Sequence, residues 1–391
     1  MKKILEGSRA IAETINNIGV GVVSAYPITP QTHIVEELAK LKADGQPNSE
    51  AGKADFEYVR AESEFAAASI VLGASAAGVR TYTATSSQGL LLMAEVLYNL
   101  AGMRLPVVMT DANRSVSAPI NIWNDQQDVM IMRDAGWIML FGETVQEVCD
   151  LHILAYKVGE KLELPVMVNL DGFILTHVVE PVEIEAAEKI KKYLPAYQSS
   201  EKLDVKNPLT FGPLVTPEHY FEIRKSLHDD LAASKAEIKK EMDNFKKIFG
   251  RPLNLAEYYG DKNAKTVIVA MGSVLGTMKE AVDEYHKNTK TQKHKNTIGI
   301  LKITAFRPFP DDEIIKLLVK AENIAVLDKS ISLGTEGILA TEIKRALYGQ
   351  SQAKITGVIM GLGGRDITKE MIKKTIEISK RTKEKIIFVG K

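Results

Sequence analysis

Residues 62–111 read ESEFAAASIVLGASAAGVRTYTATSSQGLLLMAEVLYNLAGMRLPVVMTD, and two kinds of pattern alternate along this passage. Residues 63–77 are small and rich in alanine, which predicts a helix that packs closely on its neighbours, and residues 88–101 predict a second helix. The apolar runs 79–84 and 105–111 predict buried strands. Strands that alternate with helices in this way are typical of an α/β fold with a largely parallel sheet.

The same alternation continues on the amino-terminal side of this passage. Residues 9–18 predict a helix and residues 20–25 an apolar strand. The loop YPITPQT at 26–32 contains two prolines, which disfavour helix and restrict the backbone, and a helix over 34–41 follows it. Residues 42–55 are polar and contain Gly and Pro, so they predict a surface loop, to which the sequence assigns no function.

Towards the carboxyl terminus the chain predicts a second α/β unit. Residues 164–170 repeat the buried-strand pattern, residues 180–217 have little periodicity and predict a connection, and residues 218–249 predict a long charged helix. The predicted domains are therefore residues 1–259 and residues 260–391. Strands of the second domain are expected at 266–270, 297–303, 323–328, 355–360 and 386–389.

Composition and charge exclude several classes of partner. The 391 residues include 50 Lys plus Arg and 50 Asp plus Glu, so the formal net charge is zero. Nucleic acids and anionic membranes attract clustered positive charge, and we expect neither as a partner. The sequence shows no signal-peptide pattern and no apolar run of membrane-spanning length, which predicts a cytoplasmic protein. The single cysteine, Cys149, excludes an intrachain disulfide and a cluster of cysteine ligands.

Motifs of several self-contained enzymes are missing from the sequence. No Walker loop is present, and no G-x-G-x-x-G opens a helix after a strand. The glycines of GLGG at 361–364 have the spacing of a tight loop rather than of a phosphate-binding loop. The histidines form no i, i+4 pair of the zinc type, and no serine lies in a G-x-S-x-G elbow. We therefore expect no metal site within this chain and no independent nucleotide, zinc or triad enzyme.

Three polar loops at the ends of predicted strands remain as candidate functional segments. They are YPITPQT at 26–32, RAESE at 60–64 and NRSVSAPINIWNDQQD at 113–128. Ligands of open α/β sheets bind at this kind of position. Taken singly, Glu64 fits a first-turn carboxylate favoured by the helix dipole, and Thr29 and Arg114 fit a turn hydroxyl and an ion-pair partner.

Short segments spread along nearly the whole chain form a distinctive set. They are YPITP (26–30), ESE (62–64), GASAAG (73–78), TATSSQG (83–89), AGMRLPVV (101–108), NRSVSAPINIWNDQQD (113–128), LDGFILTH (170–177), FRPFP (306–310) and GLGGRD (361–366). Together they resemble the alpha subunit of pyruvate:ferredoxin oxidoreductase. The resemblance implies a pyrimidine-type thiamine-diphosphate-binding domain with a parallel sheet, followed by an α/β domain similar to the transketolase C-terminal domain.

The family resemblance also implies the reaction and the partners. Such enzymes decarboxylate pyruvate oxidatively to acetyl-CoA and CO2, with thiamine diphosphate as cofactor and coenzyme A as co-substrate, and pass electrons to ferredoxin. This chain has no GDG…NN pattern for the magnesium diphosphate and has one cysteine. We therefore expect Mg²⁺ on a beta-type partner subunit and [4Fe–4S] clusters on gamma- and delta-type partner subunits.

The resemblance implies a role for each of three side chains. Glu64, the second Glu of ESE, matches the residue that hydrogen-bonds the aminopyrimidine ring nitrogen of the cofactor and promotes its activation. Thr29 of YPITP is expected to hydrogen-bond the substrate, and Arg114 to bind the substrate carboxylate with its planar fork. Whether Asn121, Asn124 and Asp125 have a role beyond shaping their loop is left open.

Two alternatives stay open at this point. The first is an enzyme of the same kind whose substrate is 2-oxoisovalerate, 2-oxoglutarate or oxalate instead of pyruvate. The APINIW form of the 113–128 loop favours a small substrate. The other alternative is a non-catalytic assembly subunit, against which the joint presence of Glu64, Thr29 and Arg114 argues. In the second domain, residues 272–273 and 334–337 are candidates for coenzyme A contact or for subunit assembly.

Overall fold

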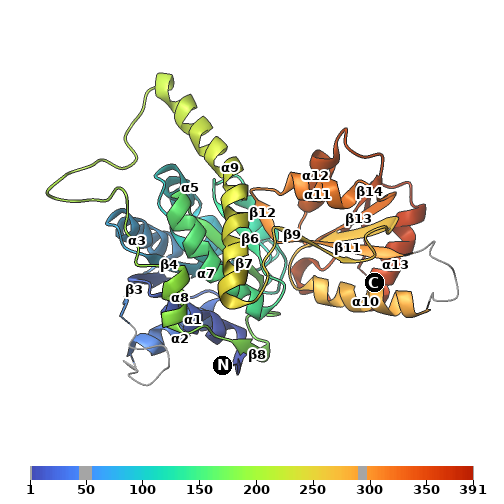
Figure 1. The fold of residues 1–391 in the computed structure, drawn as a ribbon, viewed down its shortest axis with the longest axis horizontal. Coiled ribbons are helices and arrows are strands. Elements are labelled where there is room, and N and C mark those ends of the chain that lie inside the picture. The colour runs from blue at the N-terminus through green and yellow to red at the C-terminus, as the bar shows by residue number, and fades with distance from the viewer. Residues whose placement is uncertain (1, 44–54, 289–296, 391) are drawn as a thin grey trace.

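Two mainly parallel sheets, each packed against helices, dominate the computed structural model of the chain (Figure 1). The structure describes residues 2–43, 55–288 and 297–390, so most of the loop predicted at 42–55 lies outside the described residues. The larger sheet has the order β12-β6-β7-β5-β4-β2-β3, and its neighbours are parallel except for β12 and β6. Its strands are β2 (Val22–Ala25), β3 (Glu57–Arg60), β4 (Thr81–Thr85), β5 (Val108–Asn113), β6 (Ile138–Phe141), β7 (Val166–Asp171) and β12 (Ala305–Arg307).

Helices around the larger sheet close its hydrophobic core, in which Tyr82, Trp137 and Tyr156 are among the largest fully buried side chains. The alanine-rich helix α3 contacts β2 and β4, and its Ala67 and Ala68 are fully buried, as expected for a helix that packs closely. The helices are α1 (Gly7–Ile18), α2 (Thr32–Ala43), α3 (Glu64–Ala76), α4 (Ser87–Leu92), α5 (Ala94–Gly102), α6 (Gln127–Ile131), α7 (Val145–Leu162) and α8 (Ala187–Tyr193).

The smaller sheet has the order β15-β14-β13-β10-β11-β9, and only β9 runs antiparallel to its neighbour. Its predicted strands are all found, with small shifts at their ends. The strands are β9 (Ala256–Gly260), β10 (Thr266–Ala270), β11 (Ile298–Ile303), β13 (Asn323–Asp328), β14 (Lys354–Ile359) and β15 (Ile386–Phe388). The helices are α10 (Val274–Asn288), α11 (Asp311–Leu318), α12 (Ile338–Leu347) and α13 (Lys369–Arg381), with the short turn η1 (Leu362–Gly364).

The chain passes between the two sheets more than once. Strand β12 follows β11 directly but pairs with β6 at the edge of the larger sheet, where Ala305 faces Leu140. Residue 260, the predicted boundary, is the last residue of β9 in the smaller sheet. A separate antiparallel ribbon joins β1 (Lys2–Glu6) to β8 (Val179–Glu183). The FRPFP segment thus connects the two sheets.

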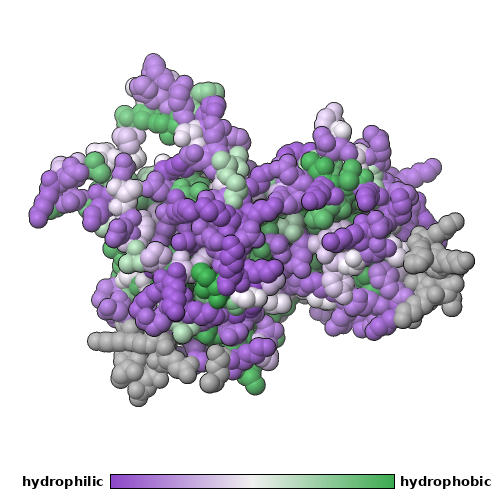
Figure 2. All heavy atoms as spheres, in the orientation of Figure 1, coloured by the Kyte–Doolittle hydropathy of each residue, from purple (hydrophilic) through white to green (hydrophobic). Residues whose placement is uncertain are grey.

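Helix α9 (Pro217–Phe249) extends beyond the body of the molecule at its amino-terminal end (Figure 1). Apolar side chains gather on this protruding end (Figure 2), where Tyr220, Phe221 and Ile223 are exposed. The rest of the helix packs through buried Ile238 and Phe245. Among the described helices, none is both long and apolar enough to span a bilayer.

Several elements differ from the sequence prediction for identifiable reasons. Helix α7 was not expected, because it is buried on most of its surface and shows no clear polar face. Strand β3 was not predicted, because it is a largely exposed edge strand without an apolar run. The helix predicted over 88–101 is divided at Met93 into α4 and α5. The segment predicted as a connection contains α8.

Candidate active site

The three predicted site segments lie at the carboxyl edge of the larger sheet. The loop 26–32 follows β2, residues 60–64 lead from the end of β3 into α3, and the loop 113–128 begins at the end of β5. The turn 86–89, which follows β4, lies at the same edge. The chain leaves β2 towards β3 on one side and leaves β4 towards β5 on the other. Neighbouring parallel strands whose connections diverge create a crevice at their carboxyl ends, where ligands of such sheets bind.

Glu64 begins α3, and Ser63 caps this helix by accepting a hydrogen bond from the Ala66 amide at 3.2 Å. The Glu64 side chain is buried, with 8% of the residue exposed. Its carboxylate makes no hydrogen bond or ion pair with any residue that the structure describes. The residue is largely buried, but its carboxylate oxygens still reach the surface of this chain, so they are accessible to a group supplied from outside.

Two more polar groups without partners belong to the turn that contains Gly89, the residue that borders the Glu64 side chain. The Thr85 hydroxyl and the Gln88 amide nitrogen are buried and have no hydrogen-bond partner among the described residues. A Cβ atom at Gly89 would lie 2.5 Å from Thr85 Oγ1 and 2.7 Å from Glu64 Oε1. Only glycine therefore leaves the Glu64 carboxylate in place. We call Glu64, Thr85 and Gln88 the open cluster.

The turn between β4 and α4 has an unusual backbone at Ser87. Its φ angle is 51°, in the left-handed region that non-glycine residues seldom occupy. The Ser87 amide donates to Asp128 Oδ2 at 2.9 Å, and its hydroxyl donates to the Ser115 carbonyl at 2.5 Å. Backbone strain of this kind persists only where surrounding contacts fix it, and it is frequent at functional sites.

Asp128 joins this turn to the end of β5. Its Oδ2 also accepts a hydrogen bond from the Arg114 amide at 2.8 Å. Burial raises the pKa of Asp128 to about 7, although the amides of Arg114 and Ser87 act in the opposite direction. Asp128 is the last residue of NRSVSAPINIWNDQQD, and the sequence analysis did not single it out. Only the fold shows that it positions two backbone amides.

Arg114 and Thr29 are in direct contact. The Arg114 guanidinium donates from Nη1 to the Thr29 carbonyl at 2.9 Å and from Nε to the Asn121 carbonyl at 2.9 Å. Burial lowers the pKa of Arg114, and the Asp128 carboxylate opposes this shift. The Nη2 group makes no hydrogen bond within the described chain, and Thr29 itself is exposed. The guanidinium is thus oriented by two carbonyls while Nη2 stays available for an anion.

The open cluster and Arg114 are connected through the β4–α4 turn. Gly89 borders Glu64, and Ser87 of the same turn binds the carboxylate of Asp128 that also holds the Arg114 amide. The structure therefore brings Arg114 and Thr29 into contact and links Glu64 to them by one short turn.

A second polar cluster joins the two sheets. Fully buried Asp171, at the end of β7, forms an ion pair with Lys329 at 3.2 Å. Its Oδ2 accepts from the Ser273 amide at 2.9 Å and hydroxyl at 2.5 Å, and its Oδ1 accepts from Asn124 at 3.2 Å and Gln126 at 3.3 Å. Burial alone would raise the pKa of Asp171, but Lys329 and Ser273 outweigh it and lower this pKa. We call these residues the intersheet clamp.

The contacts of the clamp and its surroundings show what Asn121, Asn124 and Asp125 do, which the sequence left open. Asn124 belongs to it, and the neighbouring Asp125 accepts a hydrogen bond from the Gly363 amide at 3.1 Å. Asn121 donates to the Gly363 carbonyl at 3.1 Å. The 113–128 loop is thereby held on the smaller sheet. Ser273, a candidate for coenzyme A contact, is used in the clamp, and Glu336 of the 334–337 candidate pairs with Lys344.

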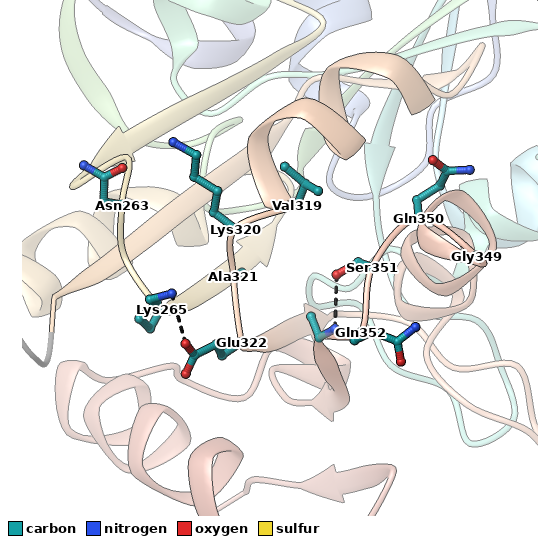
Figure 3. A pocket seen from close by; sticks show the side chains of 11 residues that line it. Asn263, Lys265, Val319, Lys320, Ala321, Glu322, Gly349, Gln350, Ser351 and Gln352 are labelled. Atoms are coloured by element: carbon teal, nitrogen blue, oxygen red, sulfur yellow. Dashed lines mark hydrogen bonds and ion pairs between the residues drawn. The ribbon is translucent and has the colours of Figure 1, made fainter.

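A cavity of about 650 Å³ lies elsewhere, on the smaller sheet (Figure 3). Two of its lining residues, Lys265 and Glu322, form an ion pair at 3.0 Å. They directly precede β10 and β13, so the cavity lies at the amino ends of parallel strands. Ligands of open α/β sheets bind at the carboxyl ends. The candidate site is therefore the carboxyl edge of the larger sheet.

Comparisons with protein families agree with the predicted resemblance. Residues 13–243 match the family described as pyruvate flavodoxin/ferredoxin oxidoreductase, thiamine diphosphate-binding. Residues 264–372 match core domain II of pyruvate:ferredoxin oxidoreductase. The predicted family and the predicted fold class are confirmed.

Individual relatives match the chain over almost its whole length. Pyruvate synthase subunit PorA of Methanosarcina barkeri is 47% identical, and the match covers 97% of this chain and 92% of the relative. The PorA subunit of Methanocaldococcus jannaschii is 46% identical, with 99% and 97% covered. Ketoisovalerate oxidoreductase subunit VorA of Pyrococcus abyssi is 41% identical, with 98% and 95% covered.

Two solved structures share the fold. The 2-oxoglutarate:ferredoxin oxidoreductase of Magnetococcus marinus, solved with 2-oxoglutarate, coenzyme A and succinyl-CoA, has a TM-score of 0.69 at 19% identity. The match covers 96% of this chain and 65% of that chain. A split-gene transketolase has a TM-score of 0.55 at 10% identity, with 96% and 98% covered. The chain belongs to the pyruvate flavodoxin/ferredoxin oxidoreductase family, as a subunit of the pyruvate synthase type of 2-oxoacid:ferredoxin oxidoreductase.

Proposed function

We propose that this chain supplies the pyrimidine side of a thiamine diphosphate site and the groups that bind the 2-oxoacid. The observation that carries the proposal is the open cluster, in which the accessible carboxylate of the largely buried Glu64 has no partner in the described chain and Gly89 leaves no room for a Cβ. A planar heterocycle with ring nitrogens would satisfy such groups. Thr85 and Gln88 add buried hydroxyl and amide groups at the same turn.

In the proposed mechanism Glu64 holds a proton at the pyrimidine ring nitrogen. Thiamine diphosphate, when bound, supplies the acidic thiazolium carbon that decarboxylation of a 2-oxoacid requires. The role of Glu64 is general acid–base catalysis towards the cofactor. The backbone of the β4–α4 turn, fixed by Asp128, keeps Gly89 against this carboxylate.

Arg114 and Thr29 are proposed to bind the substrate. The Arg114 fork is oriented by the carbonyls of Thr29 and Asn121, so its Nη2 group presents a charge-assisted donor for the substrate carboxylate. The exposed Thr29 hydroxyl next to it suits the keto oxygen or a second contact with the carboxylate. Pyruvate is the proposed substrate, since two relatives with 47% and 46% identity are pyruvate synthase subunits.

A 2-oxoisovalerate oxidoreductase is the second candidate function. The VorA subunit, named for ketoisovalerate, is 41% identical over almost the same length. Both substrates carry one carboxylate and one keto group, so Arg114 and Thr29 suit either. The branched side chain of 2-oxoisovalerate needs a larger apolar pocket, which the partner subunit helps to form.

The remaining components are proposed to come from outside this chain. Cys149, the single cysteine, is buried and isolated, so [4Fe–4S] clusters belong to gamma- and delta-type subunits. Mg²⁺ and the diphosphate site belong to a beta-type subunit, coenzyme A is the co-substrate, and ferredoxin accepts the electrons. We also propose a cytoplasmic location and a division into domains 1–259 and 260–391.

Reconstitution tests this function directly. The partner subunits are combined with or without this chain, and thiamine diphosphate binding and coenzyme A-dependent acetyl-CoA formation are measured. Binding and turnover are expected only with this chain present. Turnover without it would contradict the proposal, and a higher specificity constant for 2-oxoisovalerate than for pyruvate would favour the second candidate.

A further inference from the structure

Three potential metal ligands from distant parts of the chain meet on the larger domain. Glu6 ends β1, His33 lies in the first turn of α2, and His177 lies in the turn after β7. One ligand atom of each lies within 4.8 Å of those of the other two. Glu6 Oε1 and His33 Nδ1 are 2.7 Å apart. A carboxylate and two imidazoles are a common ligand set for divalent transition metals.

The orientation of His177 is fixed by its neighbours. Its Nδ1 atom lies 2.6 Å from the Thr176 hydroxyl, which leaves Nε2 as the free ring nitrogen. The Phe173 ring lies against His177 with centroids 4.9 Å apart. Metal-binding histidines almost always have their second ring nitrogen hydrogen-bonded in this way, because the bond fixes the tautomer and the ring orientation.

An ion pair between Glu6 and His33 does not by itself explain why His177 lies beside them. The rings of His33 and His177 lie with centroids 4.7 Å apart, a distance at which two protonated imidazoles repel each other. The cluster is thus arranged as ligands rather than as charges.

The geometry points to a site for one divalent cation of borderline softness, with Zn²⁺ the best fit, bound by Glu6, His33 and His177. Ligand atoms around a tetrahedral zinc lie roughly 3.3 Å apart, given metal–ligand distances of about 2.0–2.1 Å. Small side-chain rotations would replace the 2.7 Å hydrogen bond between Glu6 and His33 by this wider spacing and bring His177 closer, since the Glu6 and His33 side chains are 34% and 47% exposed. Water would fill the fourth position. The search of the sequence for i, i+4 pairs misses this site, because its ligands are far apart in the chain.

The segments that carry these three ligands are held together by contacts within the chain. The Ser8 hydroxyl donates to the Thr176 carbonyl at 2.9 Å, which ties the start of α1 to the His177 turn. At the other end of that turn a Cβ on Gly172 would lie 2.6 Å from Pro30, the residue after Thr29. A cation at this position would fasten the base of the loop that carries Thr29. The site is separate from the magnesium diphosphate site proposed for the partner subunit.

Metal titration of the full chain tests this inference without any activity assay. Chain stripped with a chelator is titrated with Zn²⁺ by calorimetry and with Co²⁺ by visible absorption. The expected result is one tightly bound equivalent and a Co²⁺ spectrum with nitrogen ligation. His33→Ala and His177→Ala each remove a ligand. They should weaken Zn²⁺ binding by more than the roughly 10- to 100-fold that is typical when only a residue hydrogen-bonded to a ligand is removed. Glu6→Gln should weaken it less than either.

The control is His219→Ala, which removes an exposed histidine of α9 and should leave the titration unchanged. Protection of His33 and His177 from diethyl pyrocarbonate by Zn²⁺, mapped by mass spectrometry on the parent chain, tests the site even if a variant misfolds. Absence of a tight equivalent in the parent chain, or equal affinity in the His33, His177 and His219 variants, would overturn the site.

Discussion

The open cluster and the intersheet clamp lie at the carboxyl edge of the same sheet and are both buried, but they differ in how their polar groups are satisfied. In the clamp, both oxygens of Asp171 have partners, including Lys329 at 3.2 Å and the Ser273 hydroxyl at 2.5 Å. In the open cluster, the Glu64 carboxylate, the Thr85 hydroxyl and the Gln88 amide nitrogen have none within the described residues.

The difference separates a structural cluster from a functional one. Buried polar groups in native proteins are nearly always hydrogen-bonded, and an unsatisfied group loses its hydration without compensation. The clamp is complete within the chain, so its role is to hold the sheets together. The open cluster is incomplete, so it is suited to receive polar atoms of a cofactor. Substitutions in the open cluster should therefore reduce turnover, whereas substitutions in the clamp should reduce the stability of the fold.

The largest effect is expected from Glu64→Gln in the assembled complex. The amide is nearly isosteric but cannot take part in acid–base catalysis at the pyrimidine nitrogen. Loss of such catalysis reduces turnover by roughly 10²–10⁴-fold. Exchange of the thiazolium C2 proton, measured by NMR, should slow together with turnover, while thiamine diphosphate stays bound.

Glu62→Gln is the matched control for this change, because Glu62 is exposed two residues earlier in the same ESE segment. It should leave exchange and turnover unchanged. If Glu64→Gln exchanges the C2 proton as fast as the parent, Glu64 is only a helix-start carboxylate and the contrast between the clusters disappears.

In the clamp, Lys329→Met should reduce stability instead. Removing Lys329 leaves the buried Asp171 carboxylate with its hydrogen bonds but without a counter-charge, and breaking a buried ion pair in this way costs about 3–5 kcal/mol. Urea unfolding of the full chain measures this loss. Lys239→Met, which breaks a largely exposed pair with Glu313 at 3.3 Å, should cost at most about 1 kcal/mol. Equal midpoints for the two variants would show that the clamp does not stabilise the fold.

The lowered pKa of Asp171 gives this prediction a pH dependence. A carboxyl group whose pKa is lower in the folded state stabilises the fold above its unfolded pKa, and this contribution is lost as pH falls through the folded value. The difference in stability between parent and Lys329→Met should therefore be present at neutral pH and shrink in acid.

Arg114, which the β4–α4 turn connects to the open cluster, is expected to affect substrate binding rather than cofactor binding. Arg114→Ala should lower the specificity constant for pyruvate by roughly 30- to 1,000-fold, since a lost hydrogen bond to a charged group costs about 2–4 kcal/mol. Arg114→Lys should recover part of it, because an ammonium keeps the charge but not the fork. Thiamine diphosphate binding should be unchanged. Arg133→Ala, in the turn after α6, is the control and should leave the kinetics unchanged. Unchanged pyruvate kinetics in Arg114→Ala would remove Arg114 from the site.

Sequence reasoning succeeds where local pattern and local chemistry agree. Strands β10 and β13 were predicted because each is a short apolar run between turns, and the alanine-rich α3 because small residues persist over several helical turns. The loops around Thr29, Glu64 and Arg114 were selected because polar side chains follow apolar strands. Their functional roles came from family resemblance and stay predictions.

Sequence reasoning fails where a contact joins distant residues. Nothing local to Lys329 indicates that it pairs with Asp171, because the two residues belong to different sheets. The sequence also gives no sign that β12 returns to the larger sheet, because its partner β6 is far away along the chain and belongs to a different sheet from β11, the strand before β12. Asp128 was overlooked because its role is to accept hydrogen bonds from backbone amides of two separate turns.

The smallest effect is expected at Thr29, which lies at the edge of the proposed site. Valine replaces the hydroxyl by a methyl group, while the backbone carbonyl that orients Arg114 is kept. Thr29→Val should therefore cost one neutral hydrogen bond, about 0.5–1.5 kcal/mol, or roughly 2- to 12-fold in the specificity constant for pyruvate. Thr29→Ser should restore most of the loss because it restores the hydroxyl.

Thr32→Val, at the first position of α2, is the matched control and should have no effect on the specificity constant. A loss in both valine variants would point to disturbance of the loop rather than to a substrate contact. No loss in Thr29→Val would mean that the substrate is bound by Arg114 alone. A loss far above 12-fold would place the Thr29 hydroxyl among the groups that stabilise the transition state, because substrate binding alone would then not account for it.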